Sequence, residues 1–131
     1  MENVFKIEII SPEKIIFSES ATIVKFPSYE GDMSILKDHI SIIAFLRPGI
    51  IKVDINEKSV EKFFVEDGTV EYFNNNLVIL SASVINVKDL SKDFLESSTK
   101  NALELLSGKD ISDHTRYILN YKIEALKEIR T

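Results

Sequence analysis

The sequence of 131 residues contains no cysteine and only two histidines, His39 and His114. Without cysteine, disulfide bridges, thiolate metal sites and cysteine nucleophiles are excluded. The absence of cysteine is consistent with a reducing compartment, where disulfides are rare. The two histidines fall in different expected segments and lack H-x-x-x-H spacing, so the sequence offers no recognisable imidazole metal site.

Glycine is also scarce and occurs only at Gly31, Gly49, Gly68 and Gly108. These positions are too far apart for the phosphate-binding patterns G-x-x-x-x-G-K and G-x-G-x-x-G. The nucleophile-elbow pattern G-x-S-x-G is absent as well. The sequence therefore predicts a protein with no catalytic residue, no bound cofactor and no metal.

Long apolar runs and an excess of positive charge are missing too. The longest apolar run, Ile42 to Leu46, is far shorter than the ~20 residues that a membrane-spanning helix requires. Met1 to Val4 shows no basic n-region followed by a long apolar h-region, so no signal peptide is expected. The net charge of -5 argues against a broad nucleic-acid surface. Any membrane association is expected to go through a partner.

The first two thirds of the chain have the pattern of short strands. Apolar and polar residues alternate from Phe5 to Ile9 and from Ile51 to Ile55, which is typical of strands with one buried face. Asp67-Gly68 and the asparagines from Asn74 to Asn76 mark tight turns. Strands are expected at residues 5–9, 15–17, 21–26, 51–55, 60–65, 70–73 and 77–80. This spacing predicts an antiparallel sandwich or barrel, and we expect a β-sandwich over residues 1–86.

From residue 87 to residue 131 the pattern predicts an antiparallel two-helix hairpin, so the expected fold is mainly β plus α. Asn86 is placed to cap the first helix, with Asp89 three residues further on. Gly108 suits the end of that helix, and Asp110 or Ser112 can cap the second. The expected apolar stripes are Leu90, Phe94, Leu95, Ala102, Leu103 and Leu106, then Ile118, Tyr121, Ala125, Leu126 and Ile129.

The stretch from Pro27 to Gly49 holds two of the three prolines and two of the four glycines. It is expected to be a structured surface loop that turns at Gly31, and either a recognition surface or an ordinary loop fits this composition. An acid–base pair of Asp38 and His39 is not expected, because adjacent residues of an extended chain point to opposite faces. We expect His39 to hydrogen-bond the backbone or to meet a partner.

The same stretch carries a resemblance to a known family. The residues Pro27, Glu30, Gly31, Ile35, Leu36, His39, Leu46, Pro48 and Gly49 match, in order, P-x-x-E-G-E-x-G-I-L-P-x-H-x-P followed by L-x-P-G. Asp32 stands where that pattern has Glu, whereas Ser34, Lys37 and Ser41 depart from it. The sequence thus resembles the epsilon subunit of F-type ATP synthases, which is equivalent to the mitochondrial delta subunit.

This resemblance implies a non-catalytic central-stalk, or rotor, subunit that couples rotation of the c-subunit ring to the catalytic head through the gamma subunit. It implies the gamma subunit and the c ring as partners, and alpha and beta subunits as further partners of the C-terminal helices. Gly31, Asp32 and His39 match positions of the ring-side contact, so they are assigned to partner binding. The implied location is peripheral, on the cytoplasmic face of a bacterial membrane, with an organellar inner membrane as the alternative.

Two further expectations concern ligands. Some members of this family bind ATP through a motif like I/L-D-x-x-R-A, and here Asn86 and Asp89 stand in place of its Asp and Arg. A carboxylate would then face the phosphates, so nucleotide binding is not expected. The alternative function is a small ligand-binding or enzymatic β-sandwich unrelated to ATP synthase, which would need a pocket with convergent polar groups.

Overall fold

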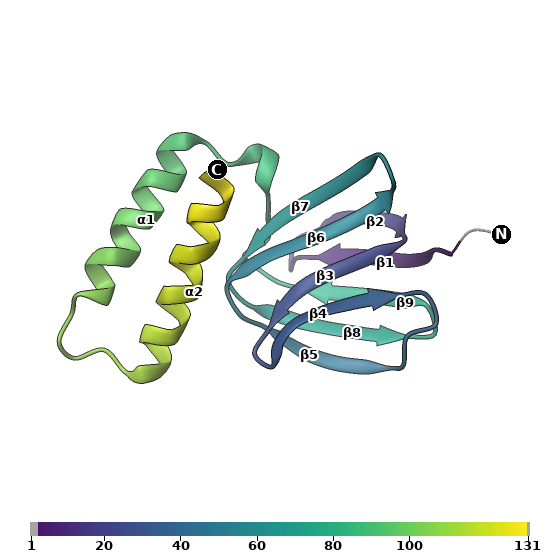
Figure 1. The fold of residues 1–131 in the computed structure, drawn as a ribbon, viewed down its shortest axis with the longest axis horizontal. Helices are drawn as coiled ribbons and strands as arrows, with labels where there is room; N and C mark the ends of the chain where they lie inside the picture. The colour runs from purple at the N-terminus through teal and green to yellow at the C-terminus, as the bar shows by residue number, and fades with distance from the viewer. Residues whose placement is uncertain (1–2, 131) are drawn as a thin grey trace.

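The computed structural model describes residues 3–130, so Met1, Glu2 and the C-terminal Thr131 lie outside it, as does part of the N-terminal segment considered for a signal peptide. The described residues form a β-sandwich beside a pair of helices (Figure 1). The strands are β1 (Phe5–Ile10), β2 (Ile15–Ala21), β3 (Ile23–Ser28), β4 (Gly31–Leu36), β5 (Ile42–Leu46), β6 (Gly49–Asn56), β7 (Ser59–Val65), β8 (Gly68–Phe73), β9 (Asn76–Leu80) and β10 (Ile85–Asn86).

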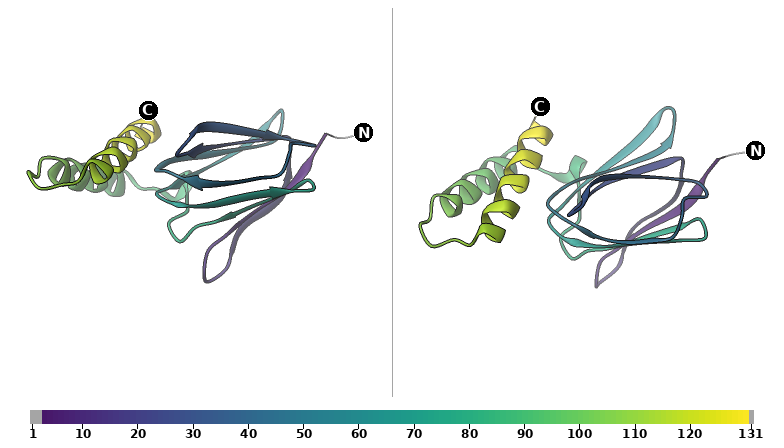
Figure 2. Two further views of the ribbon diagram at one scale, coloured as in Figure 1. Left: turned by 90° about the horizontal axis from the view of Figure 1, so that it is seen from below. Right: turned by 60° about the horizontal axis from the view of Figure 1, so that its bottom comes forward.

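The strands form two packed layers, which separate clearly when the molecule is viewed from below (Figure 2). One layer has the order β10-β7-β6-β3-β4, and the other has the order β5-β8-β9-β1-β2. A single pair, Ser28 with Leu46, joins them. Among the described strands the pairing is antiparallel, except that β1 runs parallel to β9. The expected sandwich is confirmed, with this one parallel pair as an addition.

The core lies between the two layers, as the alternating pattern predicts. Phe5, Ile7 and Ile9 are buried on β1, while Lys6 between them is exposed. Phe5 packs edge-on against Tyr72 of β8, with ring centroids 5.7 Å apart. The other buried apolar residues of this core are Ala21, Val24, Phe26, Ile35, Leu46, Ile51, Val53, Phe63, Val65, Val70, Leu77 and Ile79.

The stretch from Pro27 to Gly49 is not a loop, and that expectation was wrong. It contains β4 and β5, and β3 continues through Pro27 to Ser28. The β3–β4 hairpin closes at the pair Ser28 and Gly31, where Gly31 takes φ +120. The two prolines and two glycines occupy strand ends and turns, so they do not prevent the short apolar segments between them from pairing.

The helices begin later than the capping pattern suggested. Asn86 caps a short 3₁₀ helix, η1 (Val87–Asp89), by accepting a hydrogen bond from the Lys88 amide. Helix α1 (Lys92–Leu106) is instead capped by Ser91, whose Oγ accepts from the Phe94 amide at 3.0 Å. The expectation that Asn86 caps the long helix was therefore wrong. For helix α2 (Asp113–Arg130), Ser112 is the side chain that caps, because its Oγ accepts from the Thr115 amide.

Helix α2 lies between α1 and the sandwich (Figure 1) and therefore has two apolar faces. One face packs Ala125 and Leu126 with Phe64 of β7. The other face packs Leu119 and Ile123 with Ala102 of α1. The expected single stripe on α2 missed Leu119 and Ile123, and on α1 it included Leu103, which is 48% exposed.

Candidate functional site

The three residues expected to bind a partner do not form one cluster. Gly31 and Asp32 begin β4, at the end of the sandwich that faces α2, whereas His39 lies beyond the other end of β4 (Figure 1). A strand rises about 3.3 Å per residue, so the length of β4 separates the two positions. Two contact regions must therefore be considered.

At the first region, Arg47 connects the β3–β4 hairpin to α2. Its side chain is 10% exposed, and its Nη1 donates to the Ser28 carbonyl oxygen at 2.9 Å. Its Nη2 donates to Asp32 Oδ1 at 3.2 Å. The guanidinium carbon lies 4.0 Å from the ring centroid of Tyr121, a cation–π contact. Arg47 is thus held by two strands and one helix at once.

A row of aromatic rings extends this contact. Tyr29, in the β3–β4 turn, stacks on His114 and on Tyr117 of α2, with centroids 6.1 Å and 5.8 Å apart. Tyr117 meets Tyr121 edge-on at 4.7 Å. Desolvation, followed by the neighbouring Tyr121, raises the pKa of Tyr117. We refer to Asp32, Arg47, Tyr29, His114, Tyr117 and Tyr121 as the Arg47 junction.

Sequence reasoning did not find the Arg47 junction. A usable signal was present, because three of the four tyrosines of the chain belong to it, and Tyr117 and Tyr121 have the i, i+4 spacing of one helix face. Lys122 of α2 adds an ion pair with Glu66 at 2.7 Å, beside the junction. The hairpin is therefore attached to the sandwich by polar and aromatic contacts as well as by apolar packing.

A groove of about 630 Å³ lies next to the junction, between α2 and the outer face of β3, β6 and β7. Lys25, Lys52 and Lys62 stand directly opposite one another on these strands. Like charges in such positions repel. Glu124 and Glu128 of α2 line the same groove and offset this repulsion. The strands therefore line the groove with positive charge and α2 lines it with negative charge, which is not a convergent set of polar groups for one ligand.

The second region surrounds His39. Its Nδ1 donates to the Ile40 carbonyl oxygen at 2.7 Å, and its ring contacts Tyr72 edge-on at 5.8 Å. The expected backbone hydrogen bond is confirmed. Asp38 bonds to Asn75 instead of His39, so an acid–base pair does not form. Within residues 3–130, no group of three or more His, Asp and Glu side chains is arranged to hold a metal ion.

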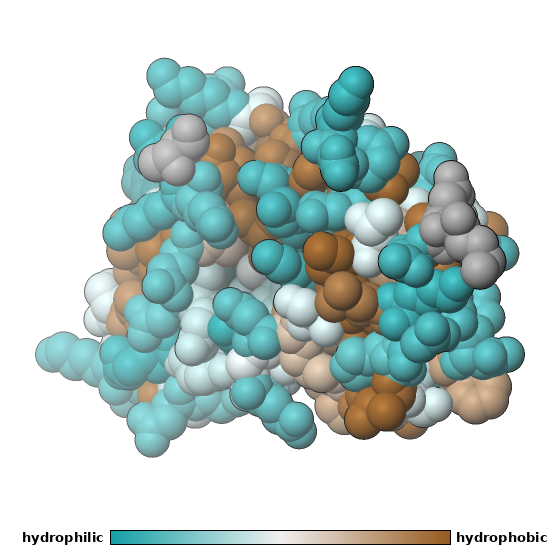
Figure 3. Space-filling model, turned by 45° about the vertical axis from the view of Figure 1, so that its right-hand side comes forward, coloured by the Kyte–Doolittle hydropathy of each residue, from teal (hydrophilic) through white to brown (hydrophobic). Residues whose placement is uncertain are grey.

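Next to this region the outer face of β5 and β8 exposes large apolar side chains. Ile43 and Phe45 of β5 are 73% and 61% exposed, and Phe73 at the end of β8 is 65% exposed. Apolar side chains gather along the lower edge of the sandwich in Figure 3, where Figure 1 places β5. We refer to Ile43, Phe45 and Phe73 as the β5 face. Several large apolar side chains exposed on one face of a sheet are typical of a surface that meets a partner.

Exposed apolar side chains on a β-sandwich with an attached helical hairpin are typical of a protein that contacts other proteins in an assembly. A sequence profile described as "ATP synthase, Delta/Epsilon chain, beta-sandwich domain" matches residues 4–87. The chain is also 46% identical, over 130 residues, to an ATP synthase epsilon chain of Pelagibacter ubique, covering 98% of this chain and 99% of the relative. The chain therefore belongs to the delta/epsilon family of F-type ATP synthase subunits, as a non-catalytic epsilon chain of the central stalk.

Other similar proteins agree with this assignment. An ATP synthase epsilon chain of Parvibaculum lavamentivorans is 31% identical over 127 residues, covering 94% of this chain and 92% of the relative. A chain in the mitochondrial ATP synthase of Euglena gracilis has the same fold, with a TM-score of 0.82, 15% identity, and coverage of 100% of this chain and 84% of that one. The family assignment excludes the alternative of an unrelated ligand-binding or enzymatic sandwich. No helix within residues 3–130 is long and apolar enough to cross a membrane.

Proposed function

We propose that this chain is a rotor coupling element, which binds the gamma subunit through the β5 face and the c ring through the end of the sandwich that carries Asp32. The observation that carries the proposal is the β5 face itself, with its exposed aromatic side chains Phe45 and Phe73. Aromatic anchors of this kind commonly supply most of the binding energy of an interface. A chain of similar fold occurs in the solved central stalk and c ring of the mitochondrial ATP synthase of Tetrahymena thermophila. Its TM-score is 0.66, at 14% identity and with 96% coverage of both chains.

The ring contact is assigned to Gly31 and Asp32. The Asp32 side chain is 83% exposed, and Arg47 holds its Oδ1 while the rest of the carboxylate faces solvent. It can therefore accept hydrogen bonds from donors on ring loops. His39 was expected on the same side, but it lies at the other end of β4 beside exposed Ile40, so we assign it to the gamma-facing contact.

The hairpin has two candidate roles. In the first it is a brake on ATP hydrolysis that meets alpha and beta subunits, and in the second it is a packing element of the sandwich. Basic Lys127 and Arg130 share the exposed part of α2 with acidic Glu124. Because the charges are mixed, we expect α2 to bind an acidic partner only weakly. The proposed location is the cytoplasmic face of a bacterial membrane, reached through the complex, with an organellar inner membrane as the alternative.

Co-purification with the gamma subunit tests the proposal. We expect the full chain to retain gamma, and the double variant Phe45→Ser and Phe73→Ser to lose it while melting normally. Leu105→Ser is the matched control, because Leu105 is 54% exposed but lies on α1. Loss of gamma with the control variant, or retention with the double variant, contradicts the assignment of the β5 face.

A further inference from the structure

The guanidinium of Arg47 is shared between the proposed ring contact and the hairpin. Asp32 accepts from Nη2 on one side, and the Tyr121 ring lies against the guanidinium, 4.0 Å from its central carbon. The Nη1 bond to the Ser28 carbonyl anchors the group in the sandwich, and its buried Nε has no hydrogen-bond partner among residues 3–130. The Asp32 carboxylate is therefore the one charged group bonded to this guanidinium in the described part of the chain.

We propose that Arg47 couples contact with the c ring to docking of the helical hairpin on the sandwich. A hydrogen-bond donor on a ring loop binds the Asp32 carboxylate in place of Arg47. The guanidinium then holds the Tyr121 ring less firmly, and the start of α2 is released. This inference rests on the proposed ring contact of Asp32. A planar guanidinium that loses its charged acceptor keeps only the Nη1 bond to the Ser28 carbonyl, so its orientation is less firmly fixed, and its contact with an aromatic ring depends on that orientation.

The coupling acts in both directions. If ring binding at Asp32 opposes docking of the hairpin, docking must oppose ring binding by the same factor. Docking also brings His114 and Tyr117 against Tyr29, which lies in the β3–β4 turn that leads into Asp32. A change in docking of the helical hairpin therefore alters both the stacked rings of Tyr29, His114 and Tyr117 and the ion pair of Arg47 with Asp32. The β3–β4 turn becomes the element through which contact with the membrane ring biases the helices.

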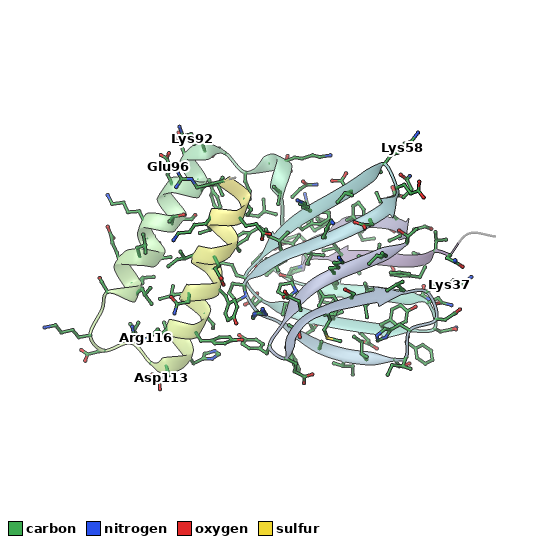
Figure 4. All side chains as sticks on the ribbon, in the orientation of Figure 1. Lys37, Lys58, Lys92, Glu96, Asp113 and Arg116 are labelled. Atoms are coloured by element: carbon green, nitrogen blue, oxygen red, sulfur yellow. The ribbon has the colours of Figure 1, made fainter. Side chains whose placement is uncertain are left out.

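The test uses the full chain, whose lack of cysteine permits labelling at two introduced sites. Lys58→Cys at the far end of the sandwich and Arg116→Cys near the start of α2 report docking as a distance (Figure 4). Measured across a urea series, Asp32→Asn should raise the undocked fraction about fivefold, the lower end of typical coupling. In a chain that also carries Tyr121→Leu, Asp32→Asn should have little further effect on the undocked fraction. In the chain that keeps Tyr121, Asp32→Glu should preserve docking.

The matched control is Asp38→Asn, the same substitution beyond the other end of β4, which should leave docking unchanged. The coupling is overturned if Asp32→Asn leaves the distance distribution unaltered, or if its effect persists in full with Tyr121→Leu. These measurements need no ring, so their failure leaves the proposed ring contact standing. Loss of that contact is measured separately, as retention of Asp32→Asn and wild-type chains on assembled complexes.

Discussion

Asp38 and Asn75 hydrogen-bond to each other in both directions across two connections of the sandwich. The Asp38 amide donates to Asn75 Oδ1 at 2.7 Å, and Asn75 Nδ2 donates to Asp38 Oδ1 at 3.1 Å. Both residues have positive φ, which Asp and Asn tolerate better than most residues. The Tyr72 hydroxyl donates to the same Asn75 oxygen at 2.7 Å. The connection that carries His39 is therefore fixed to the β8–β9 turn and presents a defined surface.

Tyr72 is expected to make the free energy of unfolding depend on pH. Burial is the main cause that raises the pKa of Tyr72 above its ordinary value. In the unfolded chain a tyrosine ionises near pH 10. Above that pH the unfolded state loses this proton first, so the free energy of unfolding falls as pH rises toward the raised pKa. We expect Tyr72→Phe to flatten the decline above about pH 10 in urea titrations.

The comparison is the wild-type chain, titrated in parallel under the same conditions. If Tyr72→Phe and the wild type lose stability with the same slope above pH 10, Tyr72 is not the source of the dependence.

Gly31 and Gly68 provide a paired test of backbone strain. Both have φ in the region that side chains rarely adopt, +120 and +148. A Cβ on Gly31 would meet open space, whereas a Cβ on Gly68 would lie 2.5 Å from the Leu80 carbonyl oxygen. We expect Gly31→Val to cost roughly 1–3 kcal/mol, from strain alone. Gly68→Val should cost more, because strain and overlap add.

Gly31→Val should also weaken retention on the c ring more than it weakens the fold, since Gly31 precedes Asp32 at the proposed contact. Thermal melting and ring retention are measured on the same preparation. A variant that loses cooperative melting and still binds the ring normally would reverse this ranking.

The strands that were predicted are those whose faces differ strongly in polarity. β1 and β6 alternate apolar and polar residues and appear where expected, although their ends differ by a residue or more. β4 was missed because Gly31 signals a turn and only Ile35 of β4 is fully buried. Nothing in a local pattern shows that an edge strand will pair with its neighbour.

The Arg47 junction was missed for a different reason. Arg47 and Tyr121 are far apart in the sequence, and neither has a motif of its own. Arg47 in a run of hydrophobic residues and turns reads as a solvated side chain, yet only 10% of it is exposed. Long-range pairing of a cation and a ring becomes visible only when the hairpin is placed on the sandwich.

The isolated chain is expected not to bind ATP at millimolar concentration. Asn86 Oδ1 is engaged by the Lys88 amide and its Nδ2 by Glu61, so the residue is committed to the start of η1. Asp89 is exposed and offers a carboxylate where phosphates would need a cation. Calorimetric titration should show no saturable heat, and Asp89→Arg alone should not create any. Saturable binding by the wild-type chain would overturn this reading.

The last prediction concerns the division of the chain at residue 86. Residues 1–86 contain every strand of the described sandwich, including β10, which pairs with β7 through Ile85 and Asn86. We expect this fragment to fold cooperatively. Residues 87–131 alone should be largely unfolded, because two short helices with apolar faces need a neighbouring surface. Circular dichroism and melting of both fragments check these statements.

The fragment should be less stable than the full chain, because removal of α1 and α2 uncovers Phe64, which is 2% exposed in the intact fold. Phe64→Ala should cost about 3–5 kcal/mol in the full chain. It should cost far less in residues 1–86, where the side chain already faces water. An equal cost in both would show that the hairpin does not pack on this site in solution.

In the assembled enzyme the same truncation separates the two roles of the hairpin. If the hairpin is a brake, its deletion raises ATP hydrolysis and leaves proton-driven synthesis nearly intact. If it is a packing element, deletion lowers the stability of the sandwich and leaves hydrolysis unchanged. The buried contacts of Phe64 with Ala125 and Leu126, and the mixed charge of α2, favour packing. Reconstituted complexes assayed in both directions decide, and loss of synthesis with a folded, bound sandwich would contradict both roles.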